Sequence, residues 1–291
     1  MRAKEQALFI QKDISMSKFT TYKTGGKAEY FCLPKNTEEI KQAINFAKEN
    51  KLDFYILGLG SNILVGDLGI KGLVCCLKDF EDIKIENNTI TALAGTPLDK
   101  VIATSILNNL GGLEKLSGIP GSVGGAVFMN AGAFNGETWQ NIVCVEVLKD
   151  GQVKTIKKED VKAEYRKVKG LENCLILSAT WALTEPADKN LREEILQKRK
   201  QKQPLEYPSA GSVFKRPIGD YASRLIDSCN LRGLTIGGAQ VAKKHAGFII
   251  NYNNATAQDI RNLMKEVQKI VKEKTGFSLE LEQILWGDFK N

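Results

Sequence analysis

The sequence predicts an α+β fold rather than a regular alternation of strands and helices. Helical and strand patterns follow one another irregularly along the 291 residues. Residues 1–187 carry two glycine-rich segments, whereas residues 188–291 carry a compact mixture of helix and strand patterns. This arrangement is typical of α+β proteins and not of doubly wound parallel sheets. We therefore expect two domains, 1–187 and 188–291.

Helices are predicted where apolar residues recur at helical spacing between start and stop signals. The first lies at 35–51, where Ile40, Ala43 and Ala47 repeat at that spacing and Thr37 can act as the N-cap. The other predicted helices are 98–110, 191–202, 220–229 and 257–275.

Short apolar runs bounded by turn residues predict strands. The turn Lys149-Asp150-Gly151 joins two of these runs and predicts a hairpin. The predicted strands are 54–57, 63–65, 73–77, 83–85, 89–94, 142–148, 153–156, 175–183, 248–251 and 278–286.

Composition places the chain among globular proteins, with 43% hydrophobic and 26% charged residues. No apolar run is long enough to span a bilayer, and the first twelve residues lack the apolar stretch of a signal peptide. The six cysteines form no C-x-x-C pair and predict reduced core thiols in a cytoplasmic protein. We expect a monomer with neither a membrane nor a nucleic-acid partner.

The net charge of +7 indicates an anionic ligand, or only a basic surface. The densest basic segment, 189–203, either steers phosphate groups or forms a solvated helix face. His245 is the single histidine, which excludes most histidine-based metal sites and Ser-His-Asp triads. It is most simply a structural residue, and we expect no metal.

Residues 118–134 form the most informative segment. Five glycines fall within it, and no charged residue occurs from Leu116 to Gly136. Glycine lets the backbone approach a ligand closely, and exposed N–H groups in such a turn bind anions. The segment therefore predicts a backbone cradle for a phosphate-bearing ligand, with a tightly packed crossing of strand and helix as the alternative.

Residues 58–62 form a second glycine loop, which follows a predicted strand. Ile63 stands where a Rossmann fingerprint has its third glycine, and a strand rather than a helix follows. A plain β-turn is the alternative. Two such loops, neither of the Rossmann type, favour an extended dinucleotide lying between subdomains.

Two further segments could carry chemistry. Ser212 has Lys215 and Arg216 close by and could donate a proton or bind a phosphate, although a structural serine in a turn is the alternative. No nucleophile elbow surrounds it, so nucleophilic serine catalysis is not expected. Glu280 and Glu282 share one face of the predicted last strand, which is either functional or merely solvated.

Taken together, the ordered motifs resemble the UDP-N-acetylenolpyruvoylglucosamine reductase family from about Thr20 to Gly287. The motifs are 20–26 (TTYKTGG), 57–64 (LGLGSNIL), 118–126 (GIPGSVGGA), 129–133 (MNAGA), 165–166 (YR), 203–215 (QPLEYPSAGSVFK), 237–240 (GGAQ) and 279–282 (LELE).

The resemblance implies an FAD-binding domain of the vanillyl-alcohol-oxidase type, built of two subdomains, and a C-terminal α+β substrate domain. It implies that NADPH reduces the FAD and that flavin N5 passes the hydride to the enolpyruvyl ether of UDP-N-acetylglucosamine-enolpyruvate. The product would be UDP-N-acetylmuramate, a peptidoglycan precursor. Because His245 lies outside the glycine loops, we expect non-covalent FAD.

The resemblance also implies roles for single residues. Ser212 matches the proton donor, Glu282 the catalytic glutamate and Arg166 the catalytic arginine. The implied substrate-binding residues are Tyr165, Tyr207 and Lys215. The implied cofactor-binding residues are Gly58, Leu59, Gly60, Ser61, Asn62, Ile63, Gly118, Pro120, Gly121, Ser122, Gly124, Gly125 and Ala126.

The chain departs from the family pattern at two points. Val168 stands where the family commonly has serine, which puts a hydrogen bond there in doubt. Arg166 and Ser212 are only 46 positions apart, and the predicted strand and basic helix already occupy that stretch. No room remains for a tyrosine-bearing lid, so the resemblance is to the shorter, lid-less form.

Two other functions remain open. The chain could be an FAD oxidoreductase of the same fold with another substrate, which oxygen or a phenol would reoxidise. It could instead be a flavin-free protein that binds a nucleotide sugar without oxidising NADPH. The joint presence of Arg166, Ser212 and Glu282 argues against the second.

Overall fold

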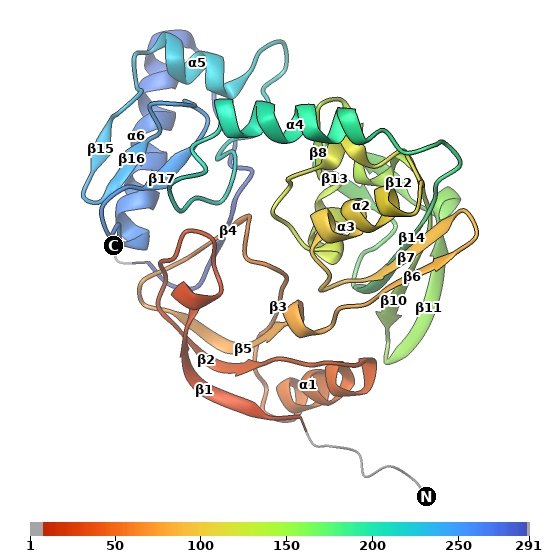
Figure 1. Ribbon diagram of the computed structural model, residues 1–291. Coiled ribbons are helices and arrows are strands. Elements are labelled where there is room, and N and C mark those ends of the chain that lie inside the picture. The colour runs from red at the N-terminus through yellow and green to blue at the C-terminus, as the bar shows by residue number, and fades with distance from the viewer. Residues whose placement is uncertain (1–7, 290–291) are drawn as a thin grey trace, which may run out of the picture. The chain divides into compact units, whose positions relative to one another are not determined.

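The computed structural model describes residues 8–289, which form two compact units (Figure 1). Unit 1 contains the described residues up to Gln11 together with Tyr30–Leu59 and Gly72–Lys198. Unit 2 contains Lys12–Glu29, Gly60–Lys71 and the described residues from Arg199 onward. The predicted domain boundary at 187–188 stays a prediction. The expected absence of a signal peptide concerns residues 1–7 in part, and these lie outside the described residues.

Five antiparallel strands form the main sheet of unit 1, and two helices pack against it. α2 (Leu98–Leu107) contacts β7, and α3 (Val123–Met129) contacts β7 and β14 (Figure 1). The strand order is β11 (Gln152–Lys157), β10 (Ile142–Lys149), β14 (Leu175–Ala182), β7 (Thr89–Leu93) and β6 (Ile83–Glu86).

The predicted hairpin at 149–151 is confirmed. β10 and β11 pair antiparallel, with Lys149 opposite Gln152. Asp150 and Gly151 both have positive φ, at 53° and 76°. Positive φ at both central residues is what a tight type I′ turn requires, because its twist matches that of the flanking strands.

A second sheet has the order β1 (Ile10–Ser15), β2 (Lys27–Cys32), β5 (Ile70–Cys76) and β3 (Phe54–Leu57). The predicted helix at 35–51 is confirmed as α1 (Thr37–Glu49), but the prediction of Thr37 as its N-cap is wrong. Asn36 is the N-cap, and its side chain accepts a hydrogen bond from the Glu39 amide at 2.9 Å. The apolar face of α1 joins the core of unit 1.

In unit 2, α6 (Ala257–Thr275) packs on a three-stranded antiparallel sheet (Figure 1). The sheet order is β15 (Thr235–Ile236), β16 (Ala239–Val241) and β17 (Ile249–Asn251). A stripe of buried residues at helical spacing faces this core: Ile260, Leu263, Met264, Val267 and Val271. The predicted bounds of α6 are confirmed, because a Thr256–Asp259 capping box starts it and Gly276 ends it.

Two more helices and three short strand pairs lie outside these sheets. α4 (Lys189–Lys202) and α5 (Ala222–Ser228) were both predicted, with bounds that differ by one or two residues. The short strand pairs are β8 (Gly132–Ala133) with β9 (Gly136–Glu137), β12 (Lys162–Glu164) with β13 (Lys167–Lys169), and β18 (Ile284–Trp286) with β4 (Ile63–Val65).

Two predicted elements end differently. The helix predicted at 98–110 ends at Leu107, because Asn109 takes a positive φ of 57° that cannot continue a right-handed helix. The strand predicted at 278–286 is wrong over its first half. Only β18 pairs as a strand, whereas Leu281 forms one isolated bridge with Phe214.

All six cysteines lie in the described part of the chain and are free thiols. Four are buried, namely Cys32, Cys75, Cys76 and Cys229. The neighbouring Cys32 thiol and burial raise the pKa of Cys75, so its thiol stays protonated and behaves as a core residue. Within residues 8–289, no helix combines the length and the apolar character needed to cross a membrane.

Asp67 supplies a second cap to α6, and we predict that Asp67→Ala destabilises unit 2. Its two carboxylate oxygens accept hydrogen bonds from the amides of Ala257 and Gln258, at 2.9 and 2.8 Å. A carboxylate at a helix N-terminus satisfies amides that have no partner within the helix and offsets the helix dipole. We expect a loss of about 1–2 kcal/mol in the free energy of unfolding, measured by urea denaturation.

The matched control is Glu273→Ala, which removes an exposed carboxylate from the other end of the same helix. This variant should unfold at the urea midpoint of the unchanged chain or slightly above it, because a negative charge near a helix C-terminus is unfavourable. Equal midpoints for the two variants would contradict the capping role of Asp67.

Candidate functional site

The first glycine loop, residues 58–62, joins β3 to β4, so the predicted strand–turn–strand arrangement is confirmed. Gly60 has a φ of +64°, and a Cβ there would lie 2.1 Å from the carbonyl oxygen of Phe19. The Thr21 amide donates to the Gly60 carbonyl at 3.1 Å. Only glycine fits this position, because the backbone is both left-handed and crowded.

The amides of this loop are available to a ligand. Among residues 8–289, the N–H groups of residues 58–62 donate to no backbone or side-chain acceptor. Successive N–H groups in a turn form a concavity that binds anions. The loop can therefore offer backbone amides to a phosphate.

The second glycine segment has fewer available amides than its glycine content indicates. The amides of Gly118, Ile119, Val123, Gly124, Gly125 and Ala126 all donate within the protein. Pro120 has no N–H. Between residues 118 and 126, the amides of Gly121 and Ser122 donate to no acceptor in the described chain, so this stretch can offer both of them to an anion.

The other glycines of the segment allow close packing. Gly124 donates to the Ala94 carbonyl at 2.8 Å, and a Cβ on Gly124 would lie 2.9 Å from the Cβ of Ala94. A Cβ on Gly58 would lie 2.2 Å from Ser122 Oγ, so the two glycine segments meet within unit 1. Ser122 is also the N-cap of α3 and accepts from the Gly125 amide at 3.3 Å.

The available amides and the crowded glycines fit the diphosphate of a dinucleotide such as the implied FAD. A Cβ at Gly58 or Gly60 would collide with Ser122 Oγ or with the Phe19 carbonyl oxygen, so a larger residue would displace the backbone that carries these amides. An anion held by neutral amides also explains why the segment carries no charged side chain of its own.

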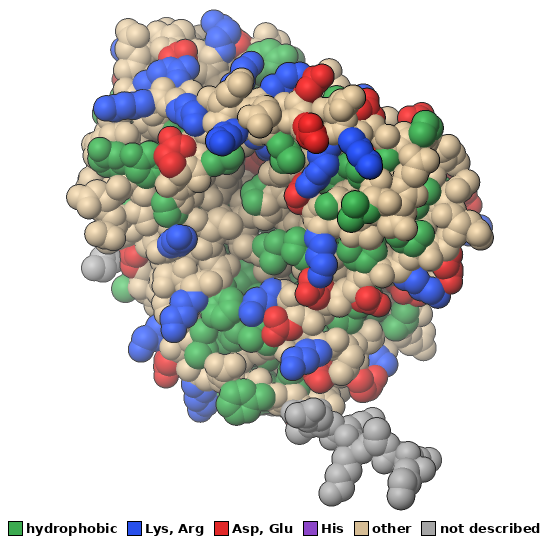
Figure 2. All heavy atoms as spheres, viewed as in Figure 1, with side chains coloured by type: hydrophobic (Ala, Val, Ile, Leu, Met, Phe, Trp, Pro, Cys, Tyr) green, Lys and Arg blue, Asp and Glu red, His purple; other side chains and the backbone are tan. Residues whose placement is uncertain are grey.

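Asp99 anchors the start of the second segment. Its Oδ1 accepts from the Gly118 amide at 2.8 Å, and both carboxylate oxygens accept from the Arg192 guanidinium at 2.8 Å. Arg192 also donates to Ser117 Oγ at 3.1 Å. One cation of the basic segment thus has a structural partner, and Figure 2 shows Lys and Arg interspersed with Asp and Glu on the visible face. Arg192 therefore has a structural role, whereas the lysines of α4 are exposed, as on a solvated helix face.

Arg166 lies at a strained and well-anchored position of unit 1. Tyr165 and Arg166 form the two-residue turn between β12 and β13, and Arg166 has a φ of +54°. Its guanidinium donates to the carbonyls of Asn130 and Gly132, at 3.3 and 3.1 Å, and lies 4.8 Å from the centre of the Tyr165 ring. A surface Tyr-Arg pair would have no such anchors. Val168 follows in β13, opposite Ala163.

Ser212 is an exposed residue on a loop of unit 2 whose backbone is fixed on two sides. Ser212 bridges Phe248, and the Val213 amide donates to the Gly247 carbonyl at 3.0 Å. On the other side, the Val213 carbonyl accepts from the Glu282 amide at 2.8 Å. The structure therefore brings the predicted serine and the predicted glutamate into one backbone network.

The same network includes the first glycine loop. Asn62 Nδ2 donates to the Glu282 carbonyl at 3.1 Å, and the Ile284 amide donates to the Asn62 carbonyl at 2.9 Å. The parallel pairing of β4 with β18 fixes this register. Unit 2 thus holds Asn62, Ser212 and Glu282 together, although they are far apart in sequence.

Gln283 and Tyr22 also support the Ser212 loop, although no local sequence pattern assigns this role to either residue. Gln283 is 3% exposed, and its amide nitrogen donates to the carbonyls of Ala210 and Gly211, at 2.9 and 3.3 Å. Its oxygen accepts from the Tyr22 hydroxyl at 3.0 Å. Burial raises the pKa of Tyr22, which keeps the hydroxyl protonated as a donor.

The two glutamates of the last segment differ in their contacts. Glu280 is exposed and forms an ion pair with Lys215, whose amide also donates to the Glu280 carbonyl at 2.8 Å. Glu282 is half-buried and takes part in the network with Asn62. Tyr207 precedes Ser212 by five positions, and its exposed ring lies 5.5 Å from the exposed ring of Tyr252.

His245 has the structural role that was expected. Its Nδ1 accepts from the Gly247 amide at 3.1 Å, and its ring packs edge-on against Phe248 at 4.9 Å. Burial lowers the pKa of His245, which favours the neutral ring that can accept this bond.

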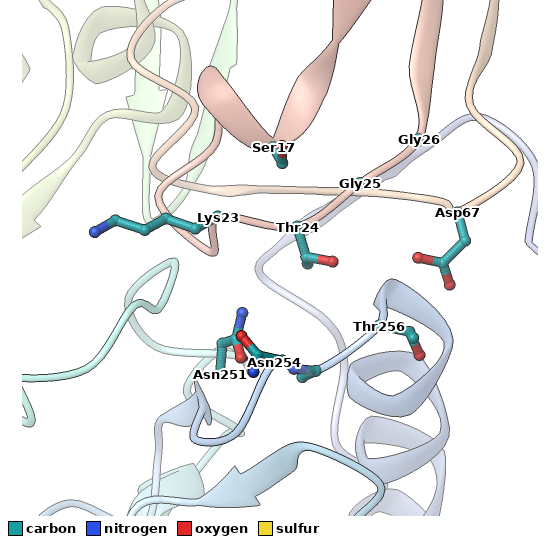
Figure 3. Close-up of a pocket in the computed structure, with 10 residues that line it drawn as sticks. Ser17, Lys23, Thr24, Gly25, Gly26, Asp67, Asn251, Asn254 and Thr256 are labelled. Carbon is teal, nitrogen blue, oxygen red and sulfur yellow. Dashed lines mark hydrogen bonds between the residues drawn. The ribbon is translucent and has the colours of Figure 1, made fainter.

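Unit 2 also contains a polar cavity of about 320 Å³ that none of the predicted site residues lines (Figure 3). Thr24 and Asp67 point into it, whereas Lys23 points away. Asp67 caps α6, and Asn251 donates to the Tyr22 carbonyl at 2.9 Å. These lining residues therefore already have structural roles.

Comparison with protein families gives two matches along the chain. Residues 28–157 match the model of an FAD binding domain. Residues 203–286 match the C-terminal domain of UDP-N-acetylenolpyruvoylglucosamine reductase. These matches confirm the predicted fold class, an FAD-binding domain followed by a C-terminal α+β domain.

Curated relatives and a solved structure agree with these matches. The chain is 43% identical over 284 residues to a UDP-N-acetylenolpyruvoylglucosamine reductase of Clostridium novyi, covering 96% of this chain and 92% of the relative. It is 42% identical over 296 residues to that of Lactobacillus helveticus, covering 99% and 98%. The crystal structure of the reductase from Thermus caldophilus matches with a TM-score of 0.83 and 32% identity, covering 96% of this chain and 100% of that one.

Proposed function

Since the chain belongs to the UDP-N-acetylenolpyruvoylglucosamine reductase family, we propose that it reduces the enolpyruvyl ether of UDP-N-acetylglucosamine-enolpyruvate to UDP-N-acetylmuramate. It is an FAD-containing oxidoreductase of peptidoglycan precursor synthesis, with NADPH as the hydride donor. The observation that carries the proposal is the backbone of Glu282, which contacts both Asn62 of the cofactor loop and Val213 beside Ser212.

The two glycine segments hold the cofactor. The amides of residues 58–62, with those of Gly121 and Ser122, bind the diphosphate. FAD, when bound, supplies the hydride transfer from NADPH to the double bond of the substrate. The protein's contribution is to hold and orient both partners and to supply the proton.

Ser212 donates that proton. Its hydroxyl makes no hydrogen bond to any residue from 8 to 289, so it can point at a substrate carbon. A hydroxyl is a weak acid, but it needs only to protonate a strongly basic, carbanion-like centre from hydrogen-bond distance. Glu282, the second acidic residue of the 279–282 motif, is the catalytic glutamate beside it.

Arg166 stabilises the negative charge that develops on the substrate. Hydride addition to the terminal carbon leaves an enolate at the carboxylate-bearing carbon, and a preorganised cation lowers its energy where water is excluded. Tyr165, Tyr207 and Lys215 bind the rest of the substrate. When Lys215 binds an anionic group of the substrate, it releases its ion pair with Glu280.

We further propose a monomer in the cytoplasm, without a nucleic-acid or membrane partner. The six free thiols suit a reducing compartment. The interspersed charges on the visible face give no continuous basic surface for nucleic acid (Figure 2).

An anaerobic flavin titration in two steps tests the function. NADPH should bleach the flavin absorbance, and the enolpyruvyl UDP-sugar should restore it. Restoration by oxygen or a phenol, and not by the UDP-sugar, would assign the chain to another substrate. Purified protein that neither carries flavin nor binds it when supplied would overturn the proposal.

A further inference from the structure

Asn130 ends α3 and is completely buried, although its side chain is polar. It takes a φ of +42°, the left-handed conformation that Asn and Gly adopt most easily at a helix end. A buried polar side chain is tolerated when its hydrogen bonds are satisfied, so the partners of Asn130 show what it holds in place.

The Asn130 side chain makes three hydrogen bonds. Its Nδ2 donates to Glu137 Oε2 at 2.9 Å and to the Glu164 carbonyl at 3.1 Å. Its Oδ1 accepts from the Trp139 amide at 3.2 Å. Glu164 is the last residue of β12, directly before the Tyr165–Arg166 turn. The side chain therefore fixes the backbone at the point where this turn begins.

The backbone of Asn130 contacts the same turn from the other side. Its carbonyl accepts from Arg166 Nη1 at 3.3 Å, and the Gly132 carbonyl accepts from Nη2 at 3.1 Å. The left-handed conformation of Asn130 directs the chain from α3 toward Gly132. One residue thus holds both the base of the turn and the guanidinium at its tip.

We propose that Asn130 is a positioning residue for Arg166. It therefore affects the half-reaction in which Arg166 acts, the reoxidation of the flavin by the substrate. The inference rests on the proposed function, in which Arg166 stabilises charge on the substrate. In this proposal α3 connects two parts of the site: Ser122 of the cofactor cradle lies at its N-terminus, and Asn130, which holds the arginine turn, lies at its C-terminus. Asn130 itself is proposed to contact neither the cofactor nor the substrate.

Asn130→Gly tests the proposal, because glycine keeps the left-handed backbone and removes only the side chain. The variant should keep its FAD and its rate of flavin reduction by NADPH. Reoxidation by the enolpyruvyl UDP-sugar, measured by stopped-flow absorbance, should slow by about 10- to 100-fold. A misplacement of about 1 Å is enough for a loss of this size.

A double-variant cycle with Arg166→Gln separates positioning from a general structural role. If Asn130 acts through Arg166, adding Asn130→Gly to Arg166→Gln should change reoxidation by less than about twofold. If reoxidation in the double variant slowed by the product of the two single-variant factors, the proposal would be overturned. An equal slowing of both half-reactions by Asn130→Gly would overturn it as well. Normal reoxidation in Arg166→Gln would remove the proposed role of Arg166, and this inference with it.

Asn109→Gly is the matched control. Asn109 also has a left-handed backbone just after a helix of unit 1, and its side chain accepts from the Ala187 amide at 3.3 Å. This variant should leave reoxidation unchanged; slowing equal to that of Asn130→Gly would overturn the proposal. If Asn130→Gly does not fold, Glu137→Gln weakens the same network and should slow reoxidation alone, whereas unaltered reoxidation would count against the proposal.

Discussion

Ser212→Ala is expected to retain flavin reduction by NADPH and to lose reoxidation by the enolpyruvyl UDP-sugar by about 10²- to 10⁴-fold, the usual contribution of a general acid. The fold should be unaffected. The contacts that fix this loop come from backbone atoms of Ser212 and Val213 and from the Gln283 side chain, and alanine keeps them all. Stopped-flow measurement of the two half-reactions checks the prediction.

Ser209→Ala is the control for this experiment. Ser209 lies three positions earlier on the same segment and should leave both half-reactions unchanged. An equal loss of both half-reactions in Ser212→Ala would mean that Ser212 has a structural role. A loss of bound FAD would lead to the same conclusion.

Local sequence signals predicted the elements whose boundaries are set by neighbouring residues. The bounds of α6 follow from its capping box and its C-terminal glycine, and the 149–151 hairpin follows from its turn residues. By contrast, α3 was not predicted. It contains two glycines, each of which costs about 1 kcal/mol in a helix, and no charged residue marks its ends. Its stability comes from packing on β7 and β14, which local sequence does not reveal.

Residues 279–282 illustrate the opposite error, a strand that was predicted but does not form. Leu279, Glu280, Leu281 and Glu282 alternate as strand residues do, but a strand also needs a partner. Only Leu281 forms a bridge, whereas the Glu280 carbonyl and the Glu282 amide bond to Lys215 and Val213. The segment is held as a connector between the Ser212 loop and β4. Its alternation therefore reflects burial of the leucines and not a place in a sheet.

The sequence predicted the site residues by motif but not the residues that hold them. Asn130, Gln283 and Tyr22 act through contacts between distant segments, such as the bond from Tyr22 to Gln283. Asn130 and Tyr22 lie in motifs of the family resemblance, but no local pattern shows which contacts they make, and an isolated Asn or Gln is ordinarily a surface residue. The glycine segment at 118–134 likewise did not show which of its amides are used inside the protein; only the hydrogen bonds reveal that Gly121 and Ser122 are available.

Gly60→Ala is expected to yield protein with little or no flavin. Alanine at a φ of +64° is strained by about 1–3 kcal/mol, and its Cβ would lie 2.1 Å from the Phe19 carbonyl oxygen. Backbone lies on both sides of this contact, so neither side can move without shifting the loop. We expect FAD affinity to fall at least about tenfold, which corresponds to about 1.4 kcal/mol. The ratio of flavin to protein absorbance, followed by titration with FAD, measures it.

Gly219→Ala separates crowding from backbone strain. Gly219 also lies in unit 2 and has a φ of +82°, but a Cβ there would meet no atom within 4 Å. It should therefore lose about 1–3 kcal/mol of stability, as Gly60→Ala does through strain, and keep its flavin. If both variants kept FAD equally well, the loop at 58–62 would not be part of the cofactor cradle. If both lost it, the effect would follow from lower stability of unit 2 rather than from the shape of the loop. Only loss in Gly60→Ala alone ties the amides of this loop to the cofactor.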